Sequence, residues 1–385
     1  MKKVASFRSA GTIWYGVGAI TKIGEEGKRL GGTKALIFTD KGVASTGIID
    51  EVKPWLNKAG IPVDVYDNVE PEPTVASFEQ CLAVIKKEKY DLLIGIGGGS
   101  SLDITKLCSV MATNPGSVEE YFGTDLVVNR GLPKIAVPTT SGTGSEVTSI
   151  GILTKTEVDL KIGVVSPYCV PEVAIVDPQL TVGMPPKVTA STGVDALAHA
   201  IESYTSVNAS EITEMLSLRA IELIANNLRT AYANGKDLEA REAMSLASLF
   251  AGLAFANAGC TAVHALSFPL GGKYKIPHGV ANALLLPYVM KYNIIGNVTK
   301  FAIIANKLGQ PIGSLSLREA AERSVEAVMS LIADLNLPKH LSEIGIKEDD
   351  IEFLAQGAST VTRLLVNNPR QLNLQDIIAI YKDAL

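Results

Sequence analysis

The sequence predicts two domains of different class: an α/β domain with a mainly parallel sheet over residues 1–185, and an all-helical domain over residues 186–385. Three observations support this division. The length of 385 residues exceeds the roughly 250–300 residues at which one hydrophobic core stops growing. Short β-branched runs alternate with helical stretches in the first half, which is typical of a parallel sheet. After Pro185 and Pro186 the strand signals almost vanish, and long helical periods replace them.

Composition and charge exclude several classes of protein. Hydrophobic residues make up 47% of the chain and charged residues 19%, which suits large cores and not a disordered protein. The formal net charge is −5 and no long basic run occurs, so we expect no nucleic-acid or membrane partner. We find no apolar run long enough to span a membrane and no signal peptide. The four widely spaced cysteines fit a reducing compartment, and we expect a cytoplasmic protein.

The first domain is expected to contain five strands, because five short runs are apolar and β-branched. They cover Lys34–Thr39, Ile61–Tyr66, Asp91–Ile96, Lys134–Pro138 and Val173–Val176. The intervening segment Val75–Glu88 has apolar residues at a 3-4-3 spacing, which predicts a helix. Within Thr148–Pro167, two short runs flank Lys155–Asp159 and predict a hairpin appended to the sheet.

The second domain is expected to consist of helices, because long stretches keep a helical period and carry few strand signals. The expected helices cover Lys187–Tyr204, Glu211–Ala233, Leu238–Asn257, Val280–Tyr292, Leu317–Leu335 and Leu374–Ala384.

A glycine-rich turn predicts a phosphate-binding site in the first domain. In Asp91–Lys106, an apolar strand runs into three glycines, and a helix begins near Ser101. Glycines permit close approach of a ligand to the backbone, and a helix N-terminus offers unpaired N–H groups to a pyrophosphate. The alternative is that the turn merely connects strand to helix, since the spacing is neither G-x-G-x-x-G nor a P-loop. A second polar, glycine-rich turn at Pro138–Ser145 follows the next strand and strengthens the dinucleotide interpretation.

Asp40 ends the first expected strand and bears on the choice of dinucleotide. A carboxylate at this place accepts hydrogen bonds from an adenosine ribose and repels a 2′-phosphate, so it favours NAD over NADP. The alternative for Asp40 is a helix or turn cap.

One carboxylate and three histidines in the second domain predict a metal site. Asp195 and His199 lie at i and i+4 in a helical segment, which places both on one helix face. His264 and His278 follow in segments of small, apolar residues. This ligand set suits Fe(II), Zn(II) or a similar ion. The alternative for each histidine is an ordinary core or surface residue, which is also our interpretation of His340, the fourth histidine of the chain.

Four longer motifs occur in a fixed order along the chain. They are GGGSSLD-x-x-K at Gly97–Lys106, TTSGTGSEVT at Thr139–Thr148, GVDALAHAIESY at Gly193–Tyr204 and PLGGKYKIPHGVANALLLP at Pro269–Pro287. With them the sequence resembles the iron-containing (group III) alcohol dehydrogenases over essentially its whole length. The resemblance implies a Rossmann-like dinucleotide domain and an all-helical metal domain, the architecture shared with dehydroquinate synthase, with the active site in the cleft between them. It also implies an NAD(P)-linked alcohol or aldehyde oxidoreductase that forms a homodimer or a larger homo-oligomer.

The resemblance assigns roles residue by residue. It implies that Asp195, His199, His264 and His278 are the metal ligands, through which catalysis proceeds. The residues implied to bind the cofactor are Gly98, Gly99 and Ser100 at the pyrophosphate, Asp103, Thr139, Thr140, Thr148 and Lys161 along the cofactor, and Asp40 as the selector of NAD(H). The implied chemistry is Lewis-acid activation of the substrate oxygen and hydride transfer between the substrate carbon and nicotinamide C4.

One departure from the family pattern bears on the substrate. The family commonly has a further histidine four residues after His264, where this sequence has Phe268. Phe268, Phe255 and Lys273 are therefore our expected substrate-pocket residues. Lys273 and Lys275 stand where relatives more often have apolar or acidic residues. They are either solvated surface charges, or one of them attracts a short anionic aldehyde that bears a carboxylate, sulfonate or phosphonate.

Three rival functions remain on the same scaffold. The first is a lyase of the dehydroquinate synthase type that recycles bound NAD, but TTSGTGSEVT and HALSFPLGG look like the dehydrogenase branch. The second is a protein that binds metal or nucleotide without catalysis, against which the intact ligand set argues. The third is a hydroxyacid-oxoacid type transhydrogenase, which would work without added NAD.

Overall fold

The computed structural model describes residues 4–156 and 160–385, and its chain forms two compact units. One unit is Ser9–Met184, and the other is Pro185–Leu385 together with the described residues that precede Ser9. The first unit is a parallel sheet covered by helices, and the second is helical, which confirms the expected fold class.

The first unit is built on a six-stranded parallel sheet in the order β1-β9-β6-β4-β2-β3. The strands are β1 (Thr12–Tyr15), β2 (Ala35–Phe38), β3 (Val63–Tyr66), β4 (Leu92–Gly97), β6 (Lys134–Pro138) and β9 (Val173–Val176). All five expected strands are present, and β1 is an additional edge strand. From β2 the chain adds β3 on one side and β4 on the other, so the strand order reverses between β2 and β4. Ligands of open α/β sheets bind at such a reversal, outside the carboxyl ends of the strands.

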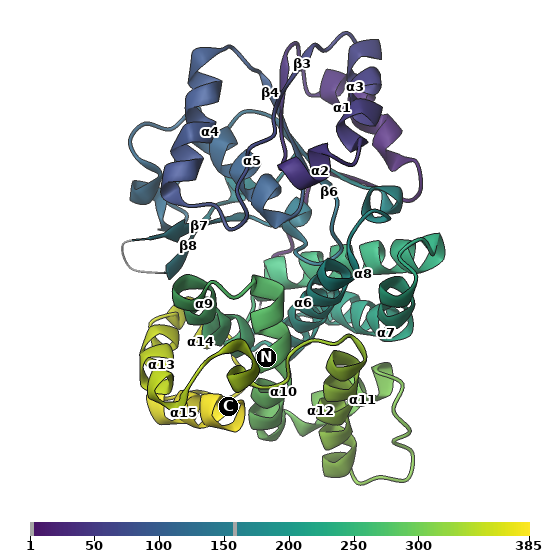
Figure 1. The fold of residues 1–385 in the computed structure, drawn as a ribbon, viewed down its shortest axis with the longest axis vertical. Helices are drawn as coiled ribbons and strands as arrows, with labels where there is room; N and C mark the ends of the chain where they lie inside the picture. Colours follow the sequence, from purple (N-terminus) through teal and green to yellow (C-terminus); the bar gives the residue numbers. More distant parts are fainter. Residues whose placement is uncertain (1–3, 157–159) are drawn as a thin grey trace. The chain divides into compact units, whose positions relative to one another are not determined.

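Helices cover both faces of this sheet, as its strands require, because β2 and β4 are buried at every position. Figure 1 shows α4 (Val75–Lys87) and α5 (Gly99–Met111) on one side of the strands. On the other side lie α1 (Ile23–Arg29) and α3 (Ile48–Lys58). The short α2 (Lys41–Ala44) follows β2 directly. Each face therefore has its own apolar core, which is the arrangement of a doubly wound sheet.

The expected hairpin is present, but it does not extend the main sheet. Strands β7 (Ile150–Lys155) and β8 (Leu160–Val165) pair antiparallel and form a separate sheet with β5 (Gly123–Thr124). The edge strands of the main sheet are β1 and β3, and among the described residues neither pairs with the hairpin. The hairpin packs against α5 instead, so closely that a Cβ on Gly151 would lie 2.6 Å from the Leu107 side chain. Part of the expected turn, residues 157–159, lies outside the described residues.

The described residues of the second unit form the six expected helices, with ends within two residues of those expected, and four further helices. In order they are α6 (Pro186–Thr205), α7 (Glu211–Ala233), α8 (Leu238–Ala258), α9 (Ala262–Tyr274), α10 (His278–Asn293), α11 (Val298–Lys307), α12 (Leu317–Asp334), α13 (Ile351–Ser359), α14 (Thr362–Leu365) and α15 (Leu374–Asp383). Helix α9 was not expected, because Pro269 and two adjacent glycines conceal its helical pattern.

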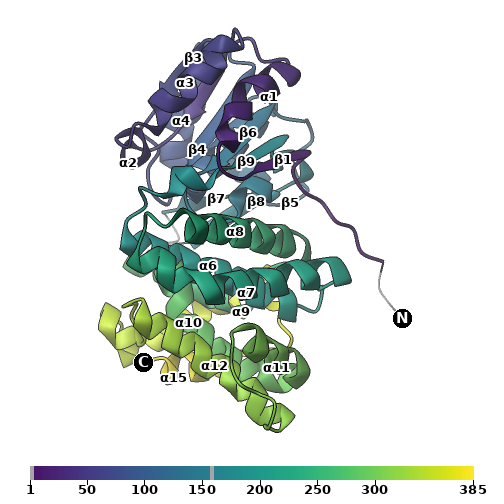
Figure 2. The ribbon, with the colours of Figure 1, turned by 90° about the vertical axis from the view of Figure 1, so that its right-hand side faces the viewer.

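Helix α10 passes through the middle of this unit and contacts α6, α9 and α12 (Figure 2). Its residues from Ala281 to Met290 are buried on all sides. Where α10 begins, a Cβ on Gly279 would lie only 2.6 Å from the carbonyl oxygen of Ser191 on α6. The glycine thus lets the two helix backbones approach, and it brings the neighbouring His278 close to α6.

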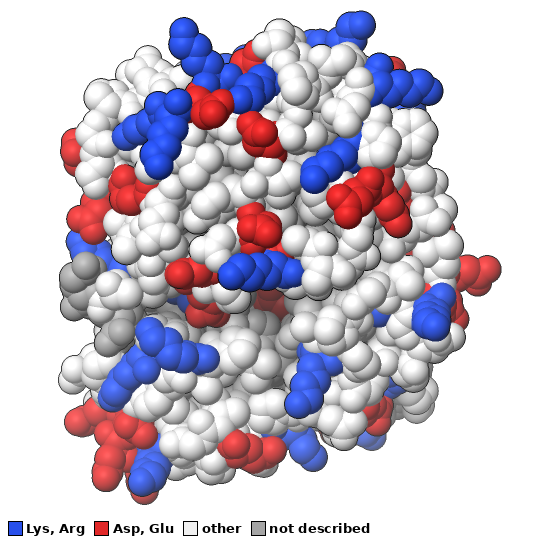
Figure 3. All heavy atoms as spheres, turned by 45° about the horizontal axis from the view of Figure 1, so that its top comes forward, with Lys and Arg blue, Asp and Glu red and all other residues white. Residues whose placement is uncertain are grey.

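Lys and Arg side chains are interspersed with Asp and Glu over the face shown in Figure 3. Within the described part of the chain, no single helix is long and apolar enough to cross a membrane, although the bent pair α8 and α9 passes a test of length and composition.

Candidate functional site

Helix α6 carries one half of the candidate metal centre. Asp195 and His199 lie one turn apart on a single face, and Glu202 continues that face at i+7 from Asp195. All three are buried. The same spacing that predicted the Asp195–His199 pair could have revealed Glu202, which our sequence analysis missed.

Helices α9 and α10 bring the remaining two histidines to this face. His264 Nε2 lies 3.0 Å from His199 Nε2 and 3.8 Å from Asp195 Oδ1. His278 Nε2 also lies 3.8 Å from Asp195 Oδ1. Asp195, His264 and His278 form a group whose donor atoms all lie within 4.8 Å of one another. The four residues expected from the sequence therefore converge, although they come from three helices and are separated by up to 83 residues (278 − 195).

A buried carboxylate fixes the orientation of His264. Glu202 Oε2 is hydrogen-bonded to His264 Nδ1. Glu202 Oε1 accepts from the backbone N–H groups of Thr261 (2.9 Å) and Val263 (2.8 Å) and from the Thr261 hydroxyl (2.8 Å). With Nδ1 held by Glu202, Nε2 of the imidazole faces the other candidate ligands. This carboxylate–imidazole arrangement is typical of metal-binding histidines.

The electrostatics of the site favour charged carboxylates. Burial opposes ionisation of Asp195, but the three imidazoles and Asn282 outweigh it and place the pKa of this carboxyl below its ordinary value. For Glu202, burial is likewise outweighed by His264 and Thr261, so its pKa is also lowered. Burial lowers the pKa of His264, but Cys260 and Glu202 raise it by more, and it lies well above the ordinary value. Both buried carboxylates are therefore held in their ionised form.

Aromatic rings line the centre. The Phe255 ring is stacked on His199, with centroids 4.2 Å apart and an angle of 15° between the planes. The Phe268 ring is buried and lies 6.3 Å from His278. Because Phe268 is one helical turn beyond His264 on α9, an apolar side chain occupies the place where the family commonly has an imidazole.

A thiol also lies beside the centre. Cys260, His199 and His264 form a second group whose donor atoms lie within 4.8 Å of one another. Burial raises the pKa of the Cys260 thiol, so the neutral form is favoured at this position. The group of Asp195, His264 and His278 is the better cation site, because the Asp195 carboxylate is charged whereas the Cys260 thiol is neutral.

The two lysines at the end of α9 have local partners. Lys273 Nζ lies 3.9 Å from the centre of the Phe353 ring and 3.9 Å from Asp350 Oδ1. Lys275, in left-handed conformation with φ of 57°, donates from Nζ to the Gly272 carbonyl at 2.6 Å and ends the helix. Both ammonium groups are thus held at the C-terminal end of α9, where the helix dipole also favours positive charge.

The glycine-rich turn of the first unit forms a cradle for a ligand. Helix α5 begins at Gly99, and no side chain caps its N-terminus. A Cβ on Gly99 would lie 3.0 Å from Thr143, and one on Gly98 would lie 3.5 Å from Thr140. Side chains at these positions would fill the space over the helix N-terminus, so the glycines keep its N–H groups accessible to an anion.

Buried hydroxyls gather at the same edge of the sheet. Those of Thr39, Ser101 and Thr140 are buried and have no hydrogen-bond partner among the described residues. They follow β2, β4 and β6, which are neighbours in the sheet. Buried polar groups are rarely left unpaired, and a polyhydroxylated, phosphorylated ligand supplies the missing partners. The residues present therefore fit a dinucleotide.

Several residues expected at the cofactor are engaged by the protein itself. Asp40 caps α2 by accepting from Val43 N–H at 3.0 Å, and Ser100 accepts from Glu72 N–H at 3.1 Å. Lys161 forms an ion pair with Glu72 at 2.8 Å. Thr139 N–H donates to the Gly97 carbonyl. Asp103 accepts from the Ser145 hydroxyl (2.6 Å) and from Ile152 N–H (3.1 Å), and the Thr148 hydroxyl accepts from Lys106 (2.9 Å).

Lys106 joins the two polar turns, and our sequence analysis had not singled it out. Its side chain is 1% exposed. Its ammonium group contacts Asp103 (3.0 Å) and donates to Thr148 Oγ1 (2.9 Å) and to the carbonyls of Ser145 (3.0 Å) and Ile150 (2.5 Å). The lysine therefore holds the loop after β6 against α5.

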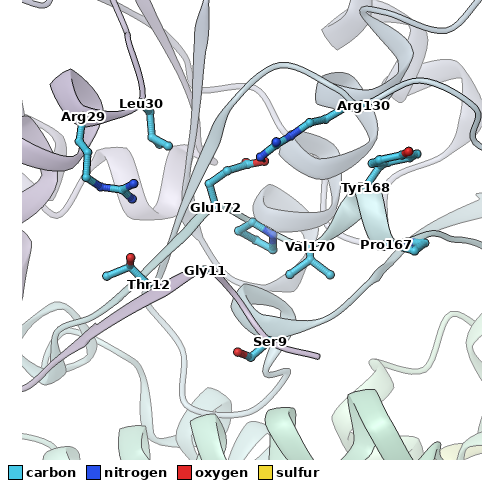
Figure 4. Close-up of a pocket in the computed structure, with 11 residues that line it drawn as sticks. Ser9, Gly11, Thr12, Arg29, Leu30, Arg130, Pro167, Tyr168, Val170 and Glu172 are labelled. Atoms are coloured by element: carbon cyan, nitrogen blue, oxygen red, sulfur yellow. The ribbon is translucent and has the colours of Figure 1, made fainter. Parts of the chain in front are cut away.

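The first unit also has a cavity of about 470 Å³ at its opposite edge. Figure 4 shows Gly11 and Thr12, where β1 begins, and Glu172, which precedes β9. Because the strands are parallel, this edge is the one away from the glycine-rich turn. Arg130, which lines the cavity, donates to Glu172 at 2.9 Å.

Comparison with known proteins identifies the family. A family model for iron-containing alcohol dehydrogenase matches residues 10–178. A second model, for the C-terminal part of the Fe-containing alcohol dehydrogenase family, matches residues 189–385. The chain belongs to the iron-containing alcohol dehydrogenase family. This confirms the resemblance inferred from the four motifs.

Relatives of this iron-containing alcohol dehydrogenase share nearly its whole length. Long-chain-alcohol dehydrogenase 1 of Geobacillus thermodenitrificans (strain NG80-2) is 47% identical over 373 residues, which are 96% of this chain and 94% of the relative. A crystal structure of 1,3-propanediol oxidoreductase has a TM-score of 0.97 and 43% identity, and the match covers 100% of both chains. Sulfoacetaldehyde reductase from Bifidobacterium kashiwanohense, solved in complex with NAD+, has a TM-score of 0.89 and 30% identity over 100% of this chain and 99% of that one.

These relatives establish the type of reaction. The protein is an oxidoreductase that acts on CH–OH groups, as an alcohol dehydrogenase or aldehyde reductase. The family is named for the iron that its members contain, and one of the relatives was solved in complex with NAD+.

We predict that Lys106→Met weakens NADH binding and lowers the free energy of unfolding by about 3 kcal/mol, because Asp103 loses its buried partner. Fluorescence titration with NADH and thermal unfolding by circular dichroism measure the two effects. Lys155→Met, which removes the more exposed ion pair with Glu119, is the matched control. Wild-type affinity and stability in Lys106→Met would show that Lys106 does not support the cofactor turns.

Proposed function

We propose that Asp195, His199, His264 and His278 hold Fe(II), that the carboxyl edge of the parallel sheet holds NAD(H), and that the substrate is a small alcohol or aldehyde. The observation that carries the proposal is the convergence of the four donor side chains from α6, α9 and α10. On this proposal residues 1–185 are the NAD-binding domain and residues 186–385 are the metal-binding domain. Zn(II) suits the same donors, because ligand type alone does not separate the two metals.

The donor set fits the expected ion. Three imidazoles and one carboxylate are borderline ligands, and the lowered pKa of Asp195 keeps its negative charge available. When bound, Fe(II) supplies Lewis-acid polarisation of the substrate's C–O bond, and NAD(H) supplies or accepts the hydride.

The protein's own side chains prepare this chemistry. Glu202 is hydrogen-bonded to Nδ1 of His264, so Nε2 is the nitrogen that faces the other candidate ligands and would bind the metal. The stacked Phe255 ring limits rotation of the His199 imidazole and excludes water from one side of it. Phe268 offers no proton acceptor, so we infer that the hydroxyl proton of an alcohol substrate leaves to solvent and not through an imidazole at this position.

At the sheet edge, the backbone N–H groups at the start of α5, around Gly98 and Gly99, suit the pyrophosphate. The hydroxyl of Thr140 is positioned to contact the same ligand, because it is buried and unpartnered among the described residues. Asp40 retains its second carboxylate oxygen for a ribose, since only Oδ1 caps α2. Thr139, Thr148 and Lys161 are assigned to the cofactor by family resemblance, and Asp103 acts through Lys106 and Ser145.

We also infer a cytoplasmic enzyme that works as a homodimer or a larger homo-oligomer. The four cysteines are buried thiols, as suits a reducing compartment. The oligomer follows from the family resemblance.

The alternative of a reductase for short anionic aldehydes has one supporting observation, the similarity to sulfoacetaldehyde reductase. Lys273 was the residue expected to attract the anion. Its ammonium group instead lies against Phe353 and near Asp350, and this favours a structural role at the end of α9. We therefore favour a neutral substrate.

The metal assignment predicts that His264→Ala loses bound iron and at least about 10³-fold in kcat/KM, because Lewis-acid activation contributes several kcal/mol. The measurement is an anaerobic panel of aldehydes with NADH and added Fe(II), together with metal content. His340→Ala removes an exposed histidine elsewhere and should behave as wild type. Full activity and iron content in His264→Ala would mean that the ligand set is wrong.

The structural role of Lys273 predicts that Lys273→Ala changes the ratio of rates for anionic and neutral aldehydes by less than about fivefold, as for an exposed charge pair. Lys275→Ala, which removes the neighbouring charge, is the control. A selective loss of more than about tenfold with the anionic aldehyde in Lys273→Ala alone would restore the anionic-substrate alternative.

A further inference from the structure

Asn282 lies among the donor atoms of the metal centre, and neither the family pattern nor our sequence analysis gave it a role. It is on α10, one helical turn after His278, and its side chain is 0% exposed. Nδ2 donates to Asp195 Oδ1 at 2.6 Å. The same nitrogen lies 3.1 Å from His264 Nε2 and 3.1 Å from His278 Nε2. One amide group thus connects three of the four proposed ligands, which come from three helices.

The two atoms of this amide have very different surroundings. Nδ2 carries two hydrogens and lies within 3.1 Å of one carboxylate oxygen and two imidazole nitrogens, all of which belong to proposed metal ligands. Oδ1 is buried and has no hydrogen-bond partner in the described part of the chain. An unpaired buried amide oxygen costs about 1–3 kcal/mol, which an apolar side chain at this position would avoid. A residue with a purely structural role would not need this arrangement.

The chemistry of the donors explains the orphaned oxygen. A cation held by Asp195, His264 and His278 repels the N–H group that lies among them and attracts a carbonyl oxygen. Rotation about the Cβ–Cγ bond by a half-turn exchanges the two atoms, and such terminal torsions are soft. Amide oxygens are themselves suitable ligands for hard or borderline cations.

We propose that Asn282 is a fifth residue of the metal centre. Through Nδ2 it holds three ligands toward one point before the metal binds, and it turns Oδ1 toward the metal afterwards. The inference rests on the proposed metal site and extends it by a residue that positions the ligands and offers an oxygen to the metal.

Two substitutions separate these two tasks. Asn282→Leu removes both the donor and the oxygen, and we expect its affinity for Fe(II) to fall about 10–100-fold, as for other residues that orient metal ligands. Asn282→Asp keeps an oxygen and adds negative charge. We expect it to bind Fe(II) at least as tightly as wild type, whereas its metal-free form melts at a lower temperature because two carboxylates face each other.

The affinities are measured anaerobically by competition with a chromogenic Fe(II) chelator, and the melting temperatures are measured on chelator-treated protein. The matched control is Asn293→Leu, which removes another buried asparagine of α10. Asn293 lies near the other end of the helix and donates to Asn368 at 2.8 Å. It should lose stability without losing affinity for Fe(II).

Wild-type affinity in Asn282→Leu, or a loss of affinity in Asn282→Asp, would overturn the inference. If Asn282→Leu does not fold, Asn282→Asp alone decides. Failure of the proposed function is distinguishable, because wild type and His264→Ala would then bind Fe(II) equally. If only the Asn282 inference fails, wild type binds more tightly than His264→Ala.

Discussion

The hydrogen bonds of the Glu202 carboxylate are the interactions on which the proposed metal centre depends. This carboxylate lies on α6, the helix that carries Asp195 and His199, and it accepts hydrogen bonds from the first N–H groups of α9 and from the His264 ring. No side chain within α9 caps that helix, so the carboxylate from α6 does so in its place. A buried charge with three or more hydrogen bonds is stable only in one geometry, since loss of any partner leaves it poorly compensated. The same contact therefore sets the distance between α6 and α9, begins α9, and orients His264.

The α/β unit uses the opposite charge for a comparable purpose. The buried ammonium of Lys106 ties α5 to the loop after β6 and to β7. In both units, a fully hydrogen-bonded buried charge on a helix fixes a neighbouring segment that carries ligand-binding groups. This explains why Asp103 and Thr148, which the family resemblance assigns to the cofactor, form hydrogen bonds with other residues of the protein. We infer that they support cofactor binding by holding the turns in place.

Much of this architecture could be predicted from local sequence patterns. The i, i+4 spacing of Asp195 and His199 is a property of one helix, so it needs no tertiary information. The proximity of His264 and His278 to that pair was suggested by the rarity of histidine and by the small, apolar residues around both, and the family resemblance made it specific, because the proximity depends on how α9 and α10 pack. Helix α9 was hidden because Pro269 and two glycines break its pattern, although tertiary contacts hold it in place. Glu202 and Asn282 lie at i+3 and i+4 from predicted ligands, and the same periodicity could have found them. The same periodicity could not predict where the β7–β8 hairpin packs, because contacts between distant segments leave no local signal in the sequence.

We infer that the Glu202 carboxylate holds His264 in the orientation that binds the metal, and Glu202→Gln tests this most directly. Glutamine keeps the size of the side chain but removes the charge, so the affinity for Fe(II) should fall about 10–100-fold. The anaerobic chelator competition should show no such fall for Glu322→Gln, which alters an exposed pair with Arg318. Wild-type affinity for Fe(II) in a folded Glu202→Gln protein would show that the Glu202 carboxylate is not needed to hold His264 for the metal.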